Sequence, residues 1–332
     1  MSTTERPRVT VVIPARNEEA SLDACLRSIR SQTEQSLQIL VVDGDSDDGT
    51  ADLVRRHIAE DDRVELLHNP QRTVPYSLNV ALRAATAENL VRVDAHAAVP
   101  PDYVARAAEL LETRRWGGVG GVKRGVGRTR AGKAIAAAMA SRFGVGGSVY
   151  HYGTEPQEVD HVPFGAYPVA LAREVGGWGE QFTVNQDFEF DQRIRQSGNP
   201  ILFDPSLVID WECRQHIGDL FKQYRRYGKG KVKVALTHPG SVRLRHLAAP
   251  ALVASAAVGA AVLVTGAVDR KWVALAAAPY PTALLAASLL TASEVEDPAA
   301  RPYLPAAFAA MHVGWGLGFW EGVRDAVSRR DT

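Results

Sequence analysis

The sequence has few cysteines and no excess of either charge. Only two cysteines, Cys25 and Cys213, occur in 332 residues, and their spacing is not of a metal-binding type, so we expect neither a disulfide framework nor a zinc site. Lys and Arg number 38, as do Asp and Glu, so the overall charge predicts no nucleic-acid partner. The first residues also lack an apolar run, which predicts a first domain that stays in the cytosol.

Apolar segments alternate with helical patterns in the first third of the chain. We expect strands over 9–14, 37–43, 64–69 and 89–94, a first helix capped by Asn17, and another helix over 75–87. This alternation predicts an α/β fold with a Rossmann-like, mostly parallel sheet flanked by helices. Ligands of such sheets bind at the carboxyl ends of the strands, where Pro14, Asp43 and Asp94 sit.

The regular pattern weakens after Gly117. We expect an Ala-rich helix near 131–141 and a flexible loop over 144–160. A helix that ends at Gly198 and a short strand over 201–205 follow.

The last quarter of the chain is apolar. Residues 247–268 and 272–293 are uncharged, and 303–320 is a shorter apolar run. About 20 residues cross the hydrocarbon core of a bilayer, so we expect about three C-terminal transmembrane helices. Because Ala is only weakly hydrophobic, an Ala-rich soluble bundle stays open as an alternative.

A basic segment without acids precedes the apolar tail. Its cations are Lys222, Arg225, Arg226, Lys229, Lys231, Lys233, Arg243 and Arg245. By the positive-inside rule this segment faces the cytosol and contacts membrane lipids, in a multi-pass protein of the cytoplasmic membrane. Three spans would place the C-terminus outside, which Arg329 and Arg330 oppose.

We therefore expect two domains. The first, 1–245, comprises a nucleotide-binding half (1–115), an acceptor-side half (116–215) and the basic segment (216–245), and 246–332 forms the membrane domain.

The stretch VRVDAHA, residues 91–97, places an acid and a histidine two residues apart at the end of a predicted strand. Asp94 and His96 there could hold one divalent ion beside a nucleotide diphosphate, although such pairs are also common as plain surface groups. Asp43 also has two interpretations, because it could accept hydrogen bonds from a base or ribose, or it could be a helix cap in an acidic turn.

Six short motifs follow one another along the chain in an order that is also found in a known protein family. They are VTVVIPARNEE (9–19), VVDGDSDDGT (41–50), VRVDAHA, GGWGEQF (176–182), QDFEFDQRIRQSG (186–198) and QYRRYG (223–228). Over roughly residues 8–235 the chain resembles the family 2 glycosyltransferases of the GT-A fold, and in particular membrane-attached bacterial enzymes of the succinoglycan type. The resemblance implies transfer of a sugar from a nucleotide-diphosphate donor, with a UDP-sugar expected, to a lipid-linked or cell-surface glycan acceptor.

The resemblance also implies roles for individual residues. Residues for the nucleotide-sugar donor are Pro14, Arg16, Glu18, Asp43, Asp94, Gln223 and Arg226. Asp94 and His96 stand where the family has its Asp-x-Asp metal motif, with His in place of the second Asp. Gln186 and Asp187 stand at a Glu-Asp pair, so Asp187 is the expected catalytic base. Gln223, Arg226 and Tyr227 resemble a Gln-x-x-Arg-Trp motif.

The chemistry of glycosyl transfer agrees with these roles. A carboxylate such as Asp187 can take the proton of an attacking hydroxyl, and direct displacement inverts the anomeric centre. A divalent metal and cations such as Arg226 stabilise the departing diphosphate. An imidazole ligand from His96 would favour Mn²⁺ over Mg²⁺.

Several residues keep a plain structural alternative. Trp178, Phe182 and Gln186 could contact the acceptor, but the two aromatic residues are equally compatible with the core. Glu189 and Asp191 could make the helix of Asp187 an acidic, solvated face, and His161, His216 and His312 are expected to be structural.

Three other functions stay open at this point. One is a polyprenyl-phosphate sugar synthase, and another is a soluble nucleotidyltransferase on a similar sheet. The third is a non-catalytic membrane subunit that binds glycan or nucleotide, which the unusual Gln186 and His96 would suit.

Overall fold

The computed structural model describes residues 6–328, which form two compact units. The first unit runs to Arg124 and resumes over Tyr152–Trp211. The second contains Gly125–His151 and the chain from Glu212 onward.

Four parallel strands form one half of the sheet in the first unit. They are β1 (Val9–Ala15), β2 (Leu37–Asp43), β3 (Val64–His68) and β4 (Asn89–Arg92), in the order β3-β2-β1-β4. Val9 of β1 lies opposite both Leu37 and Asn89. The two central strands are rich in β-branched residues because both of their faces are covered. The expected parallel half is confirmed.

The other half of the sheet is antiparallel, which the sequence analysis did not predict. The order continues from β4 through β8 (Ala166–Pro168), β6 (Gly118–Val126), β9 (Ile201–Glu212) and β5 (Ala97–Ala98), and β7 (Gln157–Val159) pairs with β9. Long stretches of chain separate β8 from its partner β4 and β9 from its partner β5, so these strand pairs are not visible as local sequence patterns.

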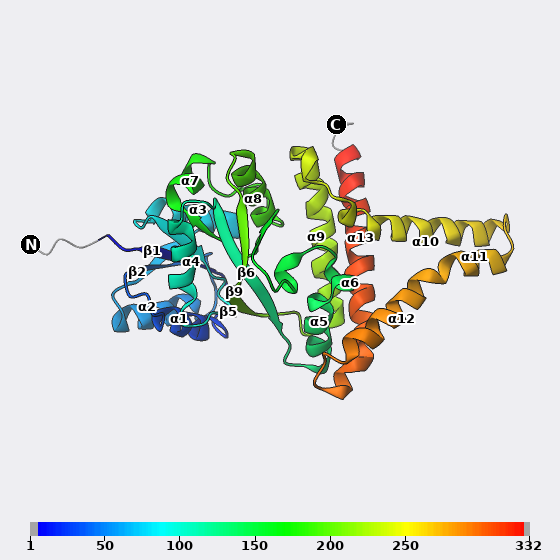
Figure 1. Cartoon of the computed structure of the whole chain (residues 1–332), viewed down its shortest axis with the longest axis horizontal. Helices are drawn as coiled ribbons and strands as arrows, with labels where there is room; N and C mark the ends of the chain where they lie inside the picture. The colour runs from blue at the N-terminus through cyan, green and yellow to red at the C-terminus, as the bar shows by residue number, and fades with distance from the viewer. Residues whose placement is uncertain (1–5, 329–332) are drawn as a thin grey trace, which may run out of the picture. The chain divides into compact units, whose positions relative to one another are not determined.

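Six helices flank this sheet, some on each side of it (Figure 1). They are α1 (Leu22–Arg30), α2 (Thr50–Glu60), α3 (Val74–Ala84), α4 (Tyr103–Glu112), α7 (Val169–Glu174) and α8 (Gln186–Gln196). The expectation that Asn17 caps α1 is wrong, because the residue before this helix is Ser21. Asn17 instead adopts a left-handed φ of 57° and accepts a hydrogen bond from the Asp47 amide.

The second unit is helical. It contains α5 (Arg130–Ala140), α6 (Arg142–Val145), α9 (Ile217–Thr237), α10 (Ala248–Thr265), α11 (Arg270–Ala277), α12 (Pro279–Ala292) and α13 (Leu304–Ser328), with short 3-10 turns at Val149–His151, Pro239–Ser241, Leu244–His246 and Pro298–Tyr303. The Ala-rich helix near 131–141 is confirmed as α5. The segment expected as a flexible loop, 144–160, contains the end of α6, a 3-10 turn and β7.

Glycines allow α13 to lie directly against α9. A Cβ at Gly318 would come within 1.8 Å of the Arg225 carbonyl oxygen, and Gly314 and Gly322, one turn to either side, face the same helix. This spacing of four residues places the three glycines on one face, so the two backbones approach closely.

This packing corrects two expectations. The apolar run 303–320 belongs to α13, but the described residues contain only two helices that qualify as candidate membrane spans, Ala248–Thr265 and Arg270–Ala292. The expected domain boundary at 245 is also displaced. The basic helix α9 packs with α13 and therefore belongs to the same unit as the C-terminal helices.

We predict that Gly318→Ala lowers the free energy of unfolding by about 1–3 kcal/mol, because the added methyl group would overlap the backbone of α9. Gly218→Ala is the matched control, since a Cβ there meets no described atom within 4 Å. The control should stay within about 1 kcal/mol of the parent protein. Urea denaturation in detergent, followed by circular dichroism, measures both. Equal stability of the two variants would contradict the close contact.

Candidate functional site

The loops that follow β1 and β2 are tied to each other. The backbone N–H of Glu18 donates to Thr50 Oγ1 at 2.9 Å, and that of Asn17 donates to Ser46 Oγ at 3.0 Å. Asp43 ends β2, and its Oδ1 accepts hydrogen bonds from the amide and hydroxyl of Ser46. Asp43 is therefore bound within the acidic turn, but it is not the helix cap, because the residue before α2 is Gly49. The donor-binding roles of Pro14, Arg16, Glu18 and Asp43 stay predictions.

Arg92, at the end of β4, brings Asp94 and Asp187 together. Its Nε donates to Asp94 Oδ1 at 2.9 Å, and its Nη1 donates to Asp187 Oδ1 in the first turn of α8. The Arg92 side chain is 4% exposed, whereas each carboxylate is 18% exposed. The guanidinium thus lies beneath two acids that reach solvent.

Burial and charge act in opposite directions on this cluster. Burial raises the pKa of Asp187 above its ordinary value, and attraction to Arg92 and His161 limits that rise. Burial also lowers the pKa of Arg92, but the two carboxylates outweigh it and hold the pKa above its ordinary value. Arg92 is therefore a permanent cation that favours an ionised Asp187.

His96 does not point its nitrogens at the same place as Asp94. The chain turns after β4, and the amide of Ala97 donates to the Asp94 carbonyl at 2.9 Å, so the extended geometry ends before His96. The indole Nε1 of Trp211 donates to His96 Nε2 at 2.8 Å, and His96 Nδ1 lies 3.2 Å from Glu18 Oε1. Because an indole only donates, we assign the neutral ring with its proton on Nδ1.

The electrostatic effects on the Glu18 and His96 pair are consistent with this contact. Burial tends to raise the pKa of Glu18, but hydrogen bonds from His96 and Ser21 outweigh it and lower that pKa. Burial lowers the pKa of His96, while Glu18 and Asp94 outweigh it and raise that pKa. The Trp211 N–H opposes ring protonation from the other side.

A divalent metal fits Asp94 but not His96. Within 6–328 the structure has no group of three His, Cys, Asp or Glu side chains arranged to hold an ion. Asp94 Oδ2 makes no hydrogen bond to a described residue, and one carboxylate plus substrate phosphates is a common way to hold Mg²⁺. Both nitrogens of His96 are occupied, so this arrangement does not favour the expected metal-ligand role of His96.

The acids that follow Asp187 on α8 are buried rather than solvated. Asp191 is fully buried and accepts hydrogen bonds from the Val162 amide at 3.0 Å and the Tyr167 hydroxyl at 2.7 Å, with His161 Nδ1 also 2.7 Å away. Glu189 pairs with Arg193. The alternative of an acidic solvated face is therefore wrong, and of these three acids Asp187 is the one that lies beside Arg92.

Trp178 and Phe182 belong to the core. Each is 1% exposed, and Trp178 stacks on Phe190 with a centroid distance of 4.2 Å. This burial favours the core alternative over contact with an acceptor, because neither ring presents a face to solvent. Gln186 is half-buried at the start of α8, and its acceptor role stays a prediction.

Gln223 and Arg226 lie on α9 in the second unit. Gln223 is buried and donates to the Tyr227 hydroxyl at 3.0 Å, and Arg226 is exposed. Their donor-binding roles stay predictions. His312 was expected to be structural, and its Nε2 lies 2.8 Å from the Phe143 carbonyl oxygen, which agrees with that role. His216 was also expected to be structural, but it is exposed at the start of α9.

The basic segment is partly neutralised within its own unit. Lys231 is buried and donates to the Ser241 carbonyl at 3.0 Å. Arg225 pairs with Glu321 and Lys229 with Asp325, both on α13. The segment therefore offers fewer unpaired cations to a lipid surface than its sequence predicts.

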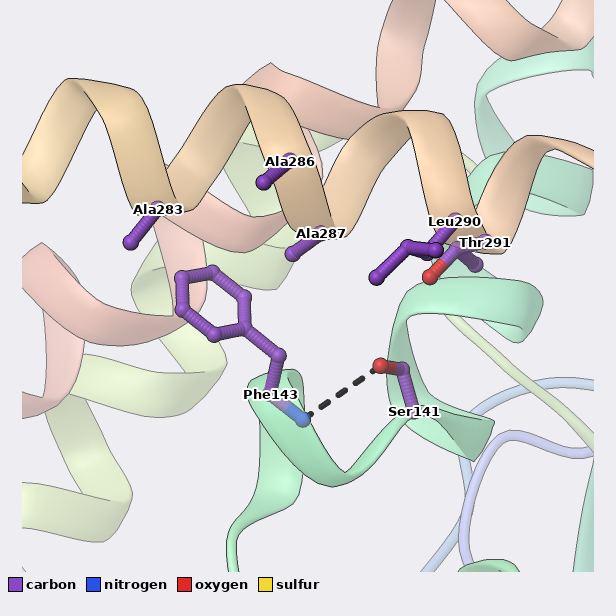
Figure 2. A pocket seen from close by; sticks show the side chains of 7 residues that line it. All are labelled: Ser141, Phe143, Ala283, Ala286, Ala287, Leu290 and Thr291. Carbon is purple, nitrogen blue, oxygen red and sulfur yellow. Dashed lines mark hydrogen bonds between the residues drawn. The ribbon is translucent and has the colours of Figure 1, made fainter.

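Two surface hollows are lined by residues other than these acids. One, in the second unit, is lined by Phe143, Ala283, Ala286, Ala287, Leu290, Ser141 and Thr291, and Figure 2 shows only small or apolar side chains and two hydroxyls there. The other lies between α1 and α2, where Arg30 already pairs with Glu60 and Asp61. The apolar hollow offers no cation to a diphosphate, and in the polar one Arg27 and Arg30 already pair with acids.

The sequence analysis missed Arg92 and Trp211. A period-two reading could have found Arg92, because residues 92 and 94 share a strand face. No local signal relates Trp211 to His96, since β9 brings Trp211 opposite Ala97 from more than a hundred residues away.

Comparisons with known proteins agree with this architecture. The family description "Glycosyl transferase family 2" matches residues 10–167. The succinoglycan biosynthesis protein ExoA of Rhizobium meliloti (strain 1021) is 32% identical over 322 residues, which cover 95% of this chain and 94% of that protein. The glycosyltransferase AglE of Haloferax volcanii is 24% identical over 73% of this chain and 78% of its own.

Solved structures show the same fold. The mannosyltransferase PcManGT from Pyrobaculum calidifontis, in complex with GDP-Man and Mn²⁺, matches with a TM-score of 0.57 and 25% identity over 92% of this chain and 87% of its own. S. aureus TarS 1–349 in complex with UDP-GlcNAc matches with a TM-score of 0.53 and 15% identity over 96% and 92%. The central sheet is thus of the GT-A type.

Proposed function

Because this chain belongs to the family 2 glycosyltransferases, we propose that it is an inverting enzyme that moves a sugar from a UDP-sugar to a lipid-linked or cell-surface glycan. One observation carries the proposal. Asp94 and Asp187 are held by one guanidinium, and neither Oδ2 atom makes a hydrogen bond to a residue in 6–328. The ExoA relative acts in succinoglycan biosynthesis, which supports a glycan as the product.

The two free carboxylate oxygens suit two different tasks. Asp187 Oδ2 takes the proton of the acceptor hydroxyl as its oxygen attacks the anomeric carbon, and the bond from that carbon to the diphosphate breaks. The bonding electrons leave with UDP. Attack from the face opposite the leaving group inverts the centre, so an α-linked donor gives a β-glycoside.

Asp94 Oδ2 and the donor diphosphate would hold a divalent ion, which supplies positive charge for the leaving group. The PcManGT complex contains Mn²⁺, which supports a divalent ion here. The argument for Mn²⁺ over Mg²⁺ from an imidazole ligand loses its basis, because His96 is bound to Trp211 and Glu18. We therefore treat the metal preference as independent of His96.

A polyprenyl-phosphate sugar synthase is the remaining alternative. Its acceptor is a phosphate that is already ionised, so it has little need of a carboxylate base. The buried, raised-pKa Asp187 favours a hydroxyl acceptor instead. Thin-layer analysis of the lipid products separates the two activities.

We predict that Asp187→Asn lowers kcat by at least about 100-fold while UDP binding stays within about threefold, because only proton removal is lost. UDP release from the UDP-sugar and calorimetric titration with UDP measure the two effects. Asp52→Asn, which alters an exposed acid of α2, is the control. Turnover near the parent rate in Asp187→Asn would exclude it as the base.

A second prediction concerns the metal. Asp94→Asn should weaken the gain in UDP affinity that MnCl₂ or MgCl₂ produces by at least about tenfold, because it removes the carboxylate charge that would hold the ion. His96→Asn should leave the ratio of Mn²⁺-supported to Mg²⁺-supported affinity unchanged. Calorimetry with and without EDTA reports both. A changed ratio in His96→Asn would restore His96 as a ligand.

The two candidate spans support a membrane location with the sheet in the cytosol. α10 has 18 residues and the segment Arg270–Ala292 has 23, which correspond to about 27 and 35 Å of helix against a core of about 30 Å. Figure 1 shows α10 and the α11–α12 segment leaving the α9–α13 pair as a hairpin. Val264, Leu289 and Leu290 on this hairpin are 88%, 67% and 76% exposed, so lipid is the covering that their chemistry suits.

A two-span hairpin also returns the C-terminal part of the chain to the cytosol, whereas three spans would place it outside. Asp269, Arg270 and Lys271 lie at its tip, and an even number of spans returns the chain to the side from which it came. We therefore propose that α9 and α13 share the cytosolic side and that the charged tip lies on the other. Arg329 and Arg330 fall outside the described residues.

We predict that Lys271→Cys reacts with a membrane-impermeant maleimide in intact cells, because it lies at the hairpin tip. Arg243→Cys, exposed before α10, is the matched control and should react only after the cells are permeabilised. The native cysteines, Cys25 and Cys213, are buried. Protection of Lys271→Cys until permeabilisation would show that the hairpin does not cross the membrane.

A further inference from the structure

We infer that Arg92 is a positioning residue that holds the catalytic base and the donor-side acid in one fixed geometry, a role that rests on the proposed function. Both carboxylates give their Oδ1 atom to the same guanidinium. Each therefore has its Oδ2 left for substrate. This one cation therefore sets the position of the two carboxylates relative to each other.

The geometry matches what a displacement at one carbon requires. The acceptor oxygen and the diphosphate oxygen lie on opposite sides of the reacting carbon, so the group that accepts the proton and the group that binds the leaving diphosphate must be separate yet fixed. A guanidinium has five N–H donors in a rigid plane and can hold two carboxylates at once. Nε and Nη2 of Arg92 face Asp94, while Nη1 faces Asp187.

The fold holds Arg92 itself from several sides. Its Cα lies opposite Val12 in the parallel ladder, and its amide donates to the Gly165 carbonyl at 3.3 Å. The ring of Phe164 lies against the guanidinium, 5.6 Å from its Cζ. Phe164 has a left-handed φ of 53°, an uncommon conformation for an aromatic residue, so the backbone is bent in a way that places this ring there.

The buried Arg92 cation also opposes the protonation of Asp187. Burial alone would favour the protonated carboxyl, which cannot accept a proton from the acceptor. Asp94 and Asp191 add negative charge that favours protonation further, while Arg92 and His161 oppose it. Because the Arg92 contact is direct, it sets where the base points and limits the rise of its pKa.

Lysine is the informative replacement for Arg92. It keeps the charge but has a single, freely rotating ammonium in place of a rigid fork, so it cannot hold both Oδ1 atoms in the same way. Displacement of a reacting group by about 1 Å is enough to cost about 100-fold in rate. We expect Arg92→Lys to lower kcat by about 100-fold in UDP release from the UDP-sugar that supports turnover.

A structural role is separated from positioning by a double-mutant cycle and a control. In the Asp187→Asn background, Arg92→Lys should lower the residual kcat by much less than 100-fold, because the part of its effect that acts through Asp187 is already gone and only the part that acts through Asp94 remains. Arg193→Lys is the matched control, since Arg193 pairs with Glu189 and the Gly177 carbonyl on the same helix but does not touch Asp187. It should alter the melting temperature and leave kcat within about twofold.

The outcomes distinguish this inference from the proposed function. The same 100-fold loss in both backgrounds, or a normal kcat in Arg92→Lys, would overturn the positioning role. Full activity of Asp187→Asn would overturn the base assignment of the proposed function instead. If Arg92→Lys yields no folded protein, Phe164→Leu gives a second test. It removes the ring from the guanidinium and should lower kcat by about tenfold, additive with Arg193→Lys but not with Asp187→Asn.

Discussion

A single buried guanidinium links the two halves of the sheet at the candidate active site. Arg92 ends the last parallel strand, Asp94 follows it, and Asp187 arrives on α8 from the part of the chain that builds the antiparallel half. A buried cation is costly unless charged partners surround it, and removing one partner of a buried pair costs about 3–5 kcal/mol. The acids and the cation therefore require one another, and the position of α8 depends on that requirement.

The contacts of α8 show how Asp187, the proposed base, differs from the other two acids on the same helix. Three acids lie on this helix within five residues, yet Asp191 is bound by Tyr167 and the Val162 amide, and Glu189 by Arg193. These two are fully committed to structure. Only Asp187 combines a cation at one oxygen with partial exposure, and this combination is what a general base needs.

The second unit is organised by the opposite kind of contact, one without charge at its centre. Glycines on α13 remove the side chains that would keep α9 at a distance, and ion pairs such as Arg225 with Glu321 form only at the edge of this interface. Apolar residues that are not used there are concentrated on the α10–α12 hairpin. A helix with glycines on one face, such as α13, thus has an apolar sequence but packs on another helix. The alanine- and leucine-rich helices beside it leave their apolar residues exposed.

The sequence by itself determined the parallel half of the sheet, the two long apolar helices and the family. Strand periodicity, the length of apolar runs and short ordered motifs are local properties of the sequence, so they can be detected without the structure. The resemblance named the two acids to which catalytic and donor-side roles are proposed, but it did not name Arg92, their common partner. Only the tertiary structure decided that Arg92 joins Asp94 to Asp187, that Trp211 occupies His96, and that Trp178 and Phe182 are core residues. Each of these facts depends on contacts between residues that are distant in the chain, and no local pattern encodes such contacts because chain topology brings them together.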